Sequence, residues 1–159
     1  SVSTLGEVAY AKACVDKSFF INSLFVSGNV RKAVNSGRGD YIPIFLSEIP
    51  ALFRSNHFQL DVALIHVSPP DHHGFCSLGV SVDVAKSAVQ EAKYIIAQVN
   101  PQMPRSHGDG LIHVSKIDAM VEANEALPNV IYHSSAEAVQ TIGKYCAELI
   151  EDGATLQTG

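Results

Sequence analysis

A chain of 159 residues is long enough to bury a hydrophobic core and short enough to form one domain. Hydrophobic residues make up 47% and charged residues 17% of it, a balance that excludes an intrinsically disordered protein. The net charge of −5 argues against a nucleic-acid partner, and the lack of an apolar run near the roughly 18 residues of a membrane span argues against a membrane protein.

Apolar runs alternate with helical patterns along the chain. Strands are expected at 20–26, 41–46, 61–67, 93–99, 110–115, 129–134 and 154–158. Helices are expected between them, at 29–36, 47–55, 82–92, 116–126 and 135–151. The alternation predicts a single α/β domain over 1–159, with a layered, mostly parallel sheet flanked by helices. Because several strands are apolar at nearly every position, we expect helices on both faces of the sheet.

The last helix carries its own start and stop signals. Ser134 or Ser135 is predicted to cap it, Glu137 lies in its first turn, and Gly153 is predicted to end it. The chain opens without a methionine and closes on "GATLQTG". We therefore expect an excerpt of a longer protein, truncated at both ends.

Three scattered cysteines indicate a reducing compartment. Cys14, Cys76 and Cys146 have no C-x-x-C spacing, and an odd number argues against a disulfide framework. A cytoplasmic location is the simplest expectation.

Ligands of parallel α/β sheets gather at the carboxyl ends of the strands. The long polar segments at these ends are 27–29, 68–81 and 100–110. Their candidate metal ligands are Asp71, His72, His73, His107, Asp109 and His113. Neighbouring side chains of an extended segment point to opposite faces, and the spacing matches neither H-E-x-x-H nor C-x-x-C. We therefore expect no metal, and we interpret these side chains as hydrogen-bonding loop residues.

Candidate nucleophiles are equally weak. "GVSVD" at 79–83 lacks the closing glycine of a G-x-S-x-G elbow. Cys76, beside Phe75 and Leu78, is more typical of a small buried hydrophobic residue than of an activated thiol. His66 lies within an expected strand, and we expect a core histidine with satisfied hydrogen bonds.

Backbone requirements explain the segment 68–81 better than reactive side chains do. Pro69-Pro70 has no N–H to donate, so the strand must stop there. Asp71 is predicted to accept hydrogen bonds from backbone N–H groups in an Asx-type turn. Gly74 and Gly79 are predicted to supply positive φ or a close approach to a ligand. The segment is therefore interpreted as a rigid rim.

Two serines, Ser77 and Ser81, precede the helix expected at 82–92. The unpaired N–H groups at such a helix start favour an anion or a polarised carbonyl.

The second loop, "NPQMPRSHGDG", contains two prolines and two glycines. It is predicted to be stiff and to present the amide and thioether groups of Gln98, Asn100 and Met103. The alternative, a surface connection with no partner, stays open.

Four segments carry a family resemblance: "SPPDHHGFCSLGVSVD", "NPQMPRSHGDG", "SGNVRKAV" and "DYIPIFLSEIP". Together they resemble the acetyl-CoA hydrolase/transferase family of class I CoA-transferases, which includes 4-hydroxybutyrate CoA-transferase. The resemblance runs from about Leu5 to Gly159. It implies that the chain is most of the first of two α/β lobes, and homo-oligomers are plausible.

The resemblance also implies a ping-pong transfer of CoA between carboxylic acids, through a glutamyl-CoA thioester. The nucleophilic glutamate of the family lies in the second lobe, so no catalytic residue is assigned here and the isolated chain is expected to be inactive. CoA enters as a substrate, with no permanently bound cofactor. The acceptor is expected to be a short acid such as 4-hydroxybutyrate, butyrate or acetate.

What this lobe is expected to contribute is a wall of the substrate cleft. By resemblance, the substrate-binding residues are Ser68, Pro69, Asp71, Gly74, Ser77, Gly79, Gln98, Asn100, Met103 and Pro104. Three alternative functions are an acetyl-CoA hydrolase, a non-catalytic acyl-CoA-binding module and a metal-dependent hydrolase.

Overall fold

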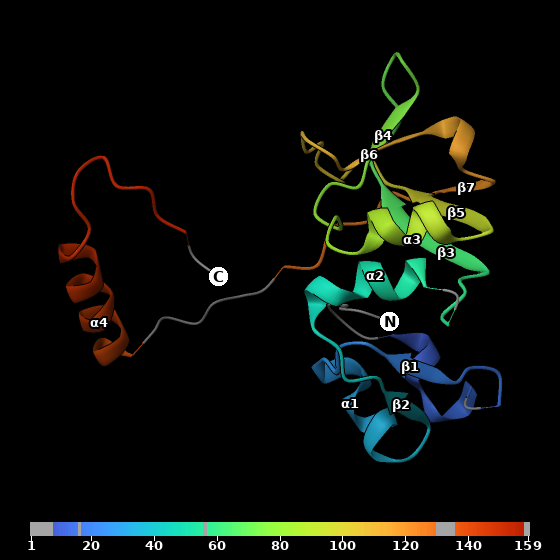
Figure 1. Ribbon diagram of the computed structural model, residues 1–159, viewed down its shortest axis with the longest axis horizontal. Coiled ribbons are helices and arrows are strands. Elements are labelled where there is room, and N and C mark those ends of the chain that lie inside the picture. The colour runs from blue at the N-terminus through green and yellow to red at the C-terminus, as the bar shows by residue number, and fades with distance from the viewer. Residues whose placement is uncertain (1–7, 16, 56, 130–135, 158–159) are drawn as a thin grey trace. The chain divides into compact units, whose positions relative to one another are not determined.

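The computed structural model describes residues 8–15, 17–55, 57–129 and 136–157 (Figure 1). The chain divides into two compact units, Ser1–Pro128 and Asn129–Gly159. The single domain expected over 1–159 stays a prediction. Within the described part of the chain, no helix is long and apolar enough to cross a membrane.

The first unit begins with a small βαβ motif. Strand β1 (Ile21–Ser23) pairs in parallel with β2 (Gly39–Tyr41), and helix α1 (Gly28–Asn35) connects them. Gly39 allows this pairing, because a Cβ at this position would lie 2.6 Å from the carbonyl oxygen of Ile21. Two short 3-10 turns, Ala9–Ala11 and Ala13–Val15, precede the motif.

The central sheet has the order β3-β5-β7, and both strand pairs are parallel. Its strands are β3 (Val62–Val67), β5 (Tyr94–Val99) and β7 (Ala119–Glu122). Helix α3 (Ala85–Glu91) makes the crossover from β3 to β5 and packs against β3 (Figure 1). Helix α2 (Ile49–Arg54) follows the 3-10 turn Leu46–Glu48 and contacts α3. The α/β class predicted from the sequence is confirmed.

A short antiparallel pair completes the unit. Strand β4 (Phe75–Ser77) lies within the expected rim and pairs with β6 (Leu111–His113), which leads into the 3-10 turn Val114–Lys116. The sequence predicts only a loop at 68–81. Three residues are too few for an alternating pattern to be recognised.

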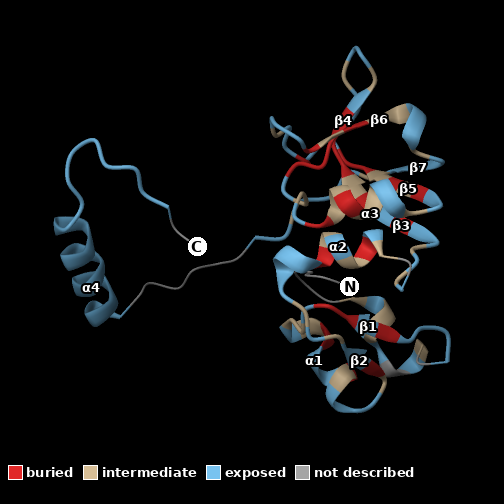
Figure 2. Cartoon of the chain, in the orientation of Figure 1, coloured by how far each residue is buried: buried red, intermediate tan, exposed pale blue. Residues whose placement is uncertain are grey.

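Buried residues alternate with more exposed ones along β3 and β5 (Figure 2), and this alternation gives the central sheet two unlike faces. Ala63, Ile65 and Ala97 are buried with the apolar side of α3. On the other face Leu64 is 77% exposed, and Val62, Tyr94 and Val121 are exposed as well. The sequence predicts helices over both faces, whereas the described residues of this unit cover one.

Two predicted elements are wrong. A strand over 41–46 is not formed, because β2 ends at Tyr41 and Pro43 has no N–H for a ladder. The helix predicted over 116–126 is replaced by β7, because Asp118 bonds to Ile95 in β5. The Asp118 carboxylate accepts the Ile95 N–H at 2.7 Å, and the backbone N–H of Asp118 donates to the Ile95 carbonyl at 2.9 Å. These bonds align the following residues with β5, and pairing overrides the local helical pattern.

The second unit contains helix α4 (Glu137–Glu148). Glu137 lies in its first turn, as predicted, while the proposed caps Ser134 and Ser135 lie outside the described residues. The helix ends before Gly153, which has φ of 81° in a later turn. The strand expected at 154–158 does not form over its described residues, 154–157. Most of the strand expected at 129–134, residues 130–134, lies outside the described residues.

The one-sided burial of β3 predicts unequal effects of truncating neighbouring side chains. Ile65→Ala should reduce the free energy of unfolding by about 2–5 kcal/mol, because it leaves a cavity in the core. Leu64→Ala should change it by less than about 0.5 kcal/mol, because Leu64 loses little buried surface. Urea unfolding of this chain, followed by circular dichroism, measures both. Equal losses would contradict the one-sided burial.

Candidate functional site

The two predicted site loops meet at the carboxyl ends of β3 and β5. Val67 pairs with Val99, and the N–H of Asn100 donates to the Val67 carbonyl at 2.9 Å. Ser68 and Asn100, the first residues beyond the strands, are therefore neighbours, and both are buried. This edge is where a parallel sheet presents its loops to ligands.

The hydroxyl of Ser77 joins the two loops. Ser77 is completely buried, and its Oγ accepts the N–H groups of Gly79 and Ser106, each at 3.1 Å. Its own N–H donates to Ser68 Oγ at 2.9 Å, and its carbonyl accepts the Ser68 N–H at 2.8 Å. Ser106 Oγ in turn donates to the Gly79 carbonyl at 3.1 Å. We call Ser68, Ser77 and Ser106 the serine network.

A turn around Asp71 closes the outer end of the first loop. Asp71 Oδ1 accepts the N–H groups of His73 and Phe75, each at 2.9 Å, which confirms the predicted Asx-type turn. Arg105 of the second loop donates to Asp71 Oδ2 at 2.5 Å and to the Phe75 carbonyl at 3.0 Å. Gly74 completes the turn with φ of 80°, as predicted.

These donors determine the charge state of Asp71. The Phe75 N–H lowers the pKa of Asp71 most, and the His73 N–H and the Arg105 guanidinium lower it further. Partial desolvation opposes them, yet the net shift of the pKa is downward. The carboxylate is therefore ionised at neutral pH and engaged in holding the loop.

Gly79 and Met103 pack where the loops approach most closely. Gly79 is buried with φ of 57°, and a Cβ there would lie 2.7 Å from the Pro104 carbonyl oxygen and closer still to the Met103 sulfur. Met103 is only 3% exposed. The loop does not present this thioether, contrary to the sequence prediction, because the sulfur fills the space that glycine leaves open.

Asn100 is equally committed to the scaffold. Its Oδ1 accepts the N–H groups of Gln102 and Glu125 at 3.0 and 3.3 Å, and its Nδ2 donates to the Glu125 carbonyl at 2.8 Å. The amide therefore ties the chain beyond β7 to the end of β5. The sequence predicts that the loop presents this amide, whereas the structure buries it.

Five of the predicted substrate-binding residues keep accessible surface, and two of them, Asp71 and Gly74, belong to the turn described above. Pro69 and Pro104 are exposed, and Gln98 is partly exposed. The side chain of Gln98 has no hydrogen-bond partner among the described residues. A substrate role for each stays a prediction.

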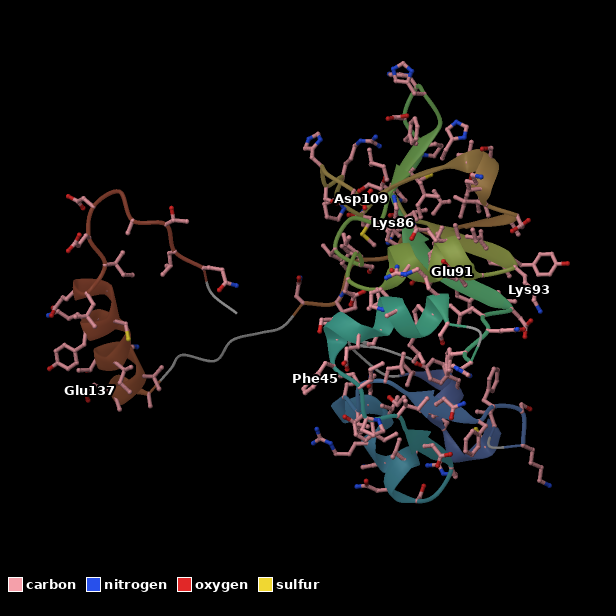
Figure 3. All side chains as sticks on the ribbon, in the orientation of Figure 1. Phe45, Lys86, Glu91, Lys93, Asp109 and Glu137 are labelled. Atoms are coloured by element: carbon pink, nitrogen blue, oxygen red, sulfur yellow. The ribbon has the colours of Figure 1, made fainter. Side chains whose placement is uncertain are left out.

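The start of α3 differs from the anion site expected after Ser77 and Ser81. The helix begins at Ala85, and Asp83 Oδ1 accepts the Val84 N–H at 2.7 Å. A carboxylate thus already lies beside the first turn, and Ser77 is turned into the serine network. The end of the second loop is instead fixed by Lys86, whose Nζ donates to the Leu111 carbonyl at 3.1 Å and lies 3.3 Å from Asp109 (Figure 3).

The residues that look most reactive lie outside the serine network. Cys76 is buried in the core, and desolvation raises the pKa of its thiol, which confirms a small hydrophobic residue. His72 and His73 are exposed. Across the described ranges, no three His, Cys, Asp or Glu side chains are grouped to hold a metal ion.

His66 differs from the satisfied core histidine that the sequence predicts. Its Nε2 is buried and has no hydrogen-bond partner among the described residues. Desolvation lowers the pKa of His66, and the charge of Glu125 opposes that shift. The imidazole is therefore neutral at physiological pH.

Sequence reasoning missed Arg105 and Ser106, which bind the second loop to the first. Both follow Met103-Pro104 in the loop whose sequence predicts stiffness and exposed amide and thioether groups, but no bond to the first loop. Arg105 offered a signal in the sequence, because a guanidinium commonly pairs with a loop carboxylate such as Asp71.

Comparison with known proteins identifies relatives over most of the chain. Residues 1–132 match a family model described as the acetyl-CoA hydrolase/transferase N-terminal domain. A succinyl-CoA:acetate/propanoyl-CoA:succinate CoA transferase of Fasciola hepatica is 54% identical over 89% of this chain and 30% of its own length. A 4-hydroxybutyrate coenzyme A transferase of Clostridium kluyveri is 50% identical over 98% of this chain and 36% of its own length.

Solved structures resemble the chain as well. RipA from Yersinia pestis aligns with a TM-score of 0.83 and 30% identity, over 94% of this chain and 36% of RipA. A 4-hydroxybutyrate CoA-transferase from Porphyromonas gingivalis aligns with a TM-score of 0.68 and 39% identity, over 88% of this chain and 37% of its own. The chain thus spans about a third of the length of these relatives.

The contact between Gly79 and Met103 can be tested by adding a methyl group. Gly79→Ala should destabilise the chain by about 1–2 kcal/mol for its backbone conformation and a further ~1–3 kcal/mol for overpacking. Gly108→Ala is the matched control, because Gly108 also has positive φ (97°) but has nothing within 4 Å of an added Cβ. Thermal unfolding compares the two. Similar losses would show that the loops do not pack closely at Gly79.

The lowered pKa of Asp71 predicts an acid-dependent loss of stability. Because the folded-state pKa is lower than the unfolded one, the stabilisation is complete above the ordinary aspartate pKa and is lost as the pH falls through the lowered value. The stability difference between the wild type and Asp71→Asn should therefore shrink over that range. Denaturant unfolding at several pH values measures it, with Asp40→Asn as an exposed control. A difference independent of pH would contradict the ionised turn.

Proposed function

Because the chain belongs to the acetyl-CoA hydrolase/transferase family, we propose that it forms most of the N-terminal lobe of an enzyme that transfers CoA between an acyl-CoA and a short carboxylic acid. The observation that carries the proposal is the serine network, which joins two loops at the carboxyl ends of β3 and β5. In this fold class that edge binds ligands. The loops would form one wall of the substrate cleft.

The acceptor acid is proposed only as a class. The relatives at 54% and 50% identity are named for different acids: succinate, acetate and propanoate in one, 4-hydroxybutyrate in the other. Short acids such as 4-hydroxybutyrate, butyrate and acetate are therefore the candidates. The description of the family model also includes acetyl-CoA hydrolases, so hydrolysis by the same site is the alternative.

The nucleophile is proposed to be a glutamate outside this chain. The loops 68–81 and 100–110 contain no glutamate. A carboxylate attack on the thioester carbonyl would expel CoA thiolate and leave an acyl-glutamyl anhydride. Attack of the thiolate on the glutamyl carbonyl would release the first acid and form a glutamyl-CoA thioester, from which the acceptor acid takes CoA by the reverse steps. Each tetrahedral oxyanion needs preorganised donors.

In this proposal the chain needs a second lobe to complete the site, and it uses CoA as a substrate with no permanently bound cofactor. A cytoplasmic location and a homo-oligomer remain parts of the proposal, the first from the unpaired cysteines and the second by family alone. The individual substrate roles of Ser68, Pro69, Asp71, Gly74 and Gly79 belong to it as well. Those of Ser77, Gln98, Asn100, Met103 and Pro104 complete the set.

The test compares the full-length protein with this chain alone. With acetyl-CoA and 4-hydroxybutyrate, the full-length protein should form 4-hydroxybutyryl-CoA and acetate, measured by chromatography of the CoA esters. The 159-residue chain should form neither. Peptide mass spectrometry after incubation with acyl-CoA should locate a CoA adduct on a glutamate outside 1–159.

Three results would separate the alternatives. Release of free CoA without exchange would favour the hydrolase. Exchange catalysed by the isolated chain would contradict a nucleophile outside it. A full-length protein with neither exchange nor hydrolysis, for any of the acids named above, would overturn the proposed function.

A further inference from the structure

His66 and Gln98 lie side by side at the ligand-binding edge of the sheet. The parallel register pairs His66 of β3 with Gln98 of β5, near the carboxyl end of each strand. Paired residues of adjacent strands point to the same face. Both side chains therefore belong to the face that α3 does not cover, one residue before the last residue of each strand.

Both side chains have unused hydrogen-bonding groups. His66 Nε2 is buried and has no partner among the described residues, and no described residue bonds the amide of Gln98. A buried polar atom without a partner costs about 1–3 kcal/mol, so proteins rarely leave one in place without a reason. The buried His66 Nε2, beside the partly exposed and uncommitted amide of Gln98, indicates that a further polar group completes the pair.

The surroundings of the pair are apolar. The register places on the same face Val62, Leu64, Tyr94, Ile96, Ala119 and Val121. None of these residues carries a positive charge. The face therefore offers an aliphatic surface that ends in two uncharged hydrogen-bonding side chains.

The charge that acts on His66 is negative. The backbone of Glu125 is bonded to the side chain of Asn100, and the Glu125 carboxylate acts electrostatically on His66. A carboxylate ligand would be repelled by Glu125, and none of the face residues named above is a cation that could offset the repulsion. An uncharged oxygen would accept hydrogen bonds from the pair without that repulsion.

We propose that His66 Nε2–H and the Gln98 amide together bind an uncharged oxygen of the acyl group of the CoA ester. The inference rests on the proposed function, because it takes the acyl-CoA as the ligand of this edge. Two sources of that oxygen are possible: the thioester carbonyl, which every acyl-CoA has, or a hydroxyl on the acyl chain. His66 is then a further substrate-binding residue, and not a core histidine.

The test uses kinetics of the full-length protein with butyryl-CoA and with 4-hydroxybutyryl-CoA, each with acetate as the acceptor. His66→Leu removes the donor, and kcat/KM should fall about tenfold for at least one of the two esters. His66→Gln keeps an amide donor near the position of Nε2 and should recover most of that loss. Asp40→Asn, an exposed substitution in β2 outside the central sheet, is the control and should retain the wild-type value.

The pattern of losses identifies the oxygen. Equal losses with both esters would assign the thioester carbonyl, and a loss with 4-hydroxybutyryl-CoA alone would assign the hydroxyl. Gln98→Leu should repeat the pattern, and it carries the test if His66→Leu fails to fold. A merely structural role would lower the melting temperature and reduce both activities without recovery in His66→Gln.

Wild-type kinetics with both esters in His66→Leu and Gln98→Leu would overturn the inference. Failure of the proposed function is distinguishable, because then the unmodified protein would transfer CoA from neither ester. In that case calorimetric titration with butyryl-CoA and 4-hydroxybutyryl-CoA decides: equal affinity of the wild type and His66→Leu for both, or no binding to the wild type, would also overturn it.

Discussion

The geometry of the candidate site depends on one buried hydroxyl, that of Ser77. It accepts N–H groups from Gly79 and Ser106, and the backbone of Ser77 exchanges hydrogen bonds with Ser68. Buried N–H groups need acceptors, and few side chains are small enough to supply one at a position with no exposed surface. Ser77 therefore joins the end of β3 to the second loop at the buried centre of the site, and the Arg105–Asp71 contact joins the loops at its outer end.

Around this network the site is built mostly from backbone. Asp71, Asn100 and Met103, which sequence alone suggests as ligand contacts, use their polar or bulky groups to hold the loops in place. The exposed histidines at 72 and 73 take no part in the serine network. A rigid rim of this kind suits a reaction in which a thioester must be held against donors that do not reorganise. The polar groups of the site without a hydrogen-bond partner among the described residues belong to His66 and Gln98, which lie within β3 and β5 just before the loops begin.

Sequence patterns predicted the parts of the fold that local chemistry determines. The runs at 61–67 and 93–99 became β3 and β5 because both are long and apolar, and the rim conformations followed from Pro69, Asp71 and Gly74. The errors came from contacts between distant residues. Asp118 aligns β7 with Ile95 over 20 positions away in sequence, and nothing within 116–126 signals that partner.

The site shows the same division between local and distant causes. The Asx turn could be predicted because its donors lie within four residues of Asp71. The burial of Met103 could not, because it depends on the space left by Gly79 in the other loop. The strand context of His66 predicts satisfied hydrogen bonds, whereas the hydrogen bonds of a strand side chain depend on which groups reach its face of the sheet.

The central claim is that the loops joined by Ser77 form a wall of the substrate cleft. A crystal structure of the full-length protein with a non-reactive acyl-CoA analogue tests it most directly. The account predicts that the acyl group lies against the loops 68–81 and 100–110, with the serine network intact. An analogue bound elsewhere, with both loops facing only solvent or other parts of the protein, would contradict it.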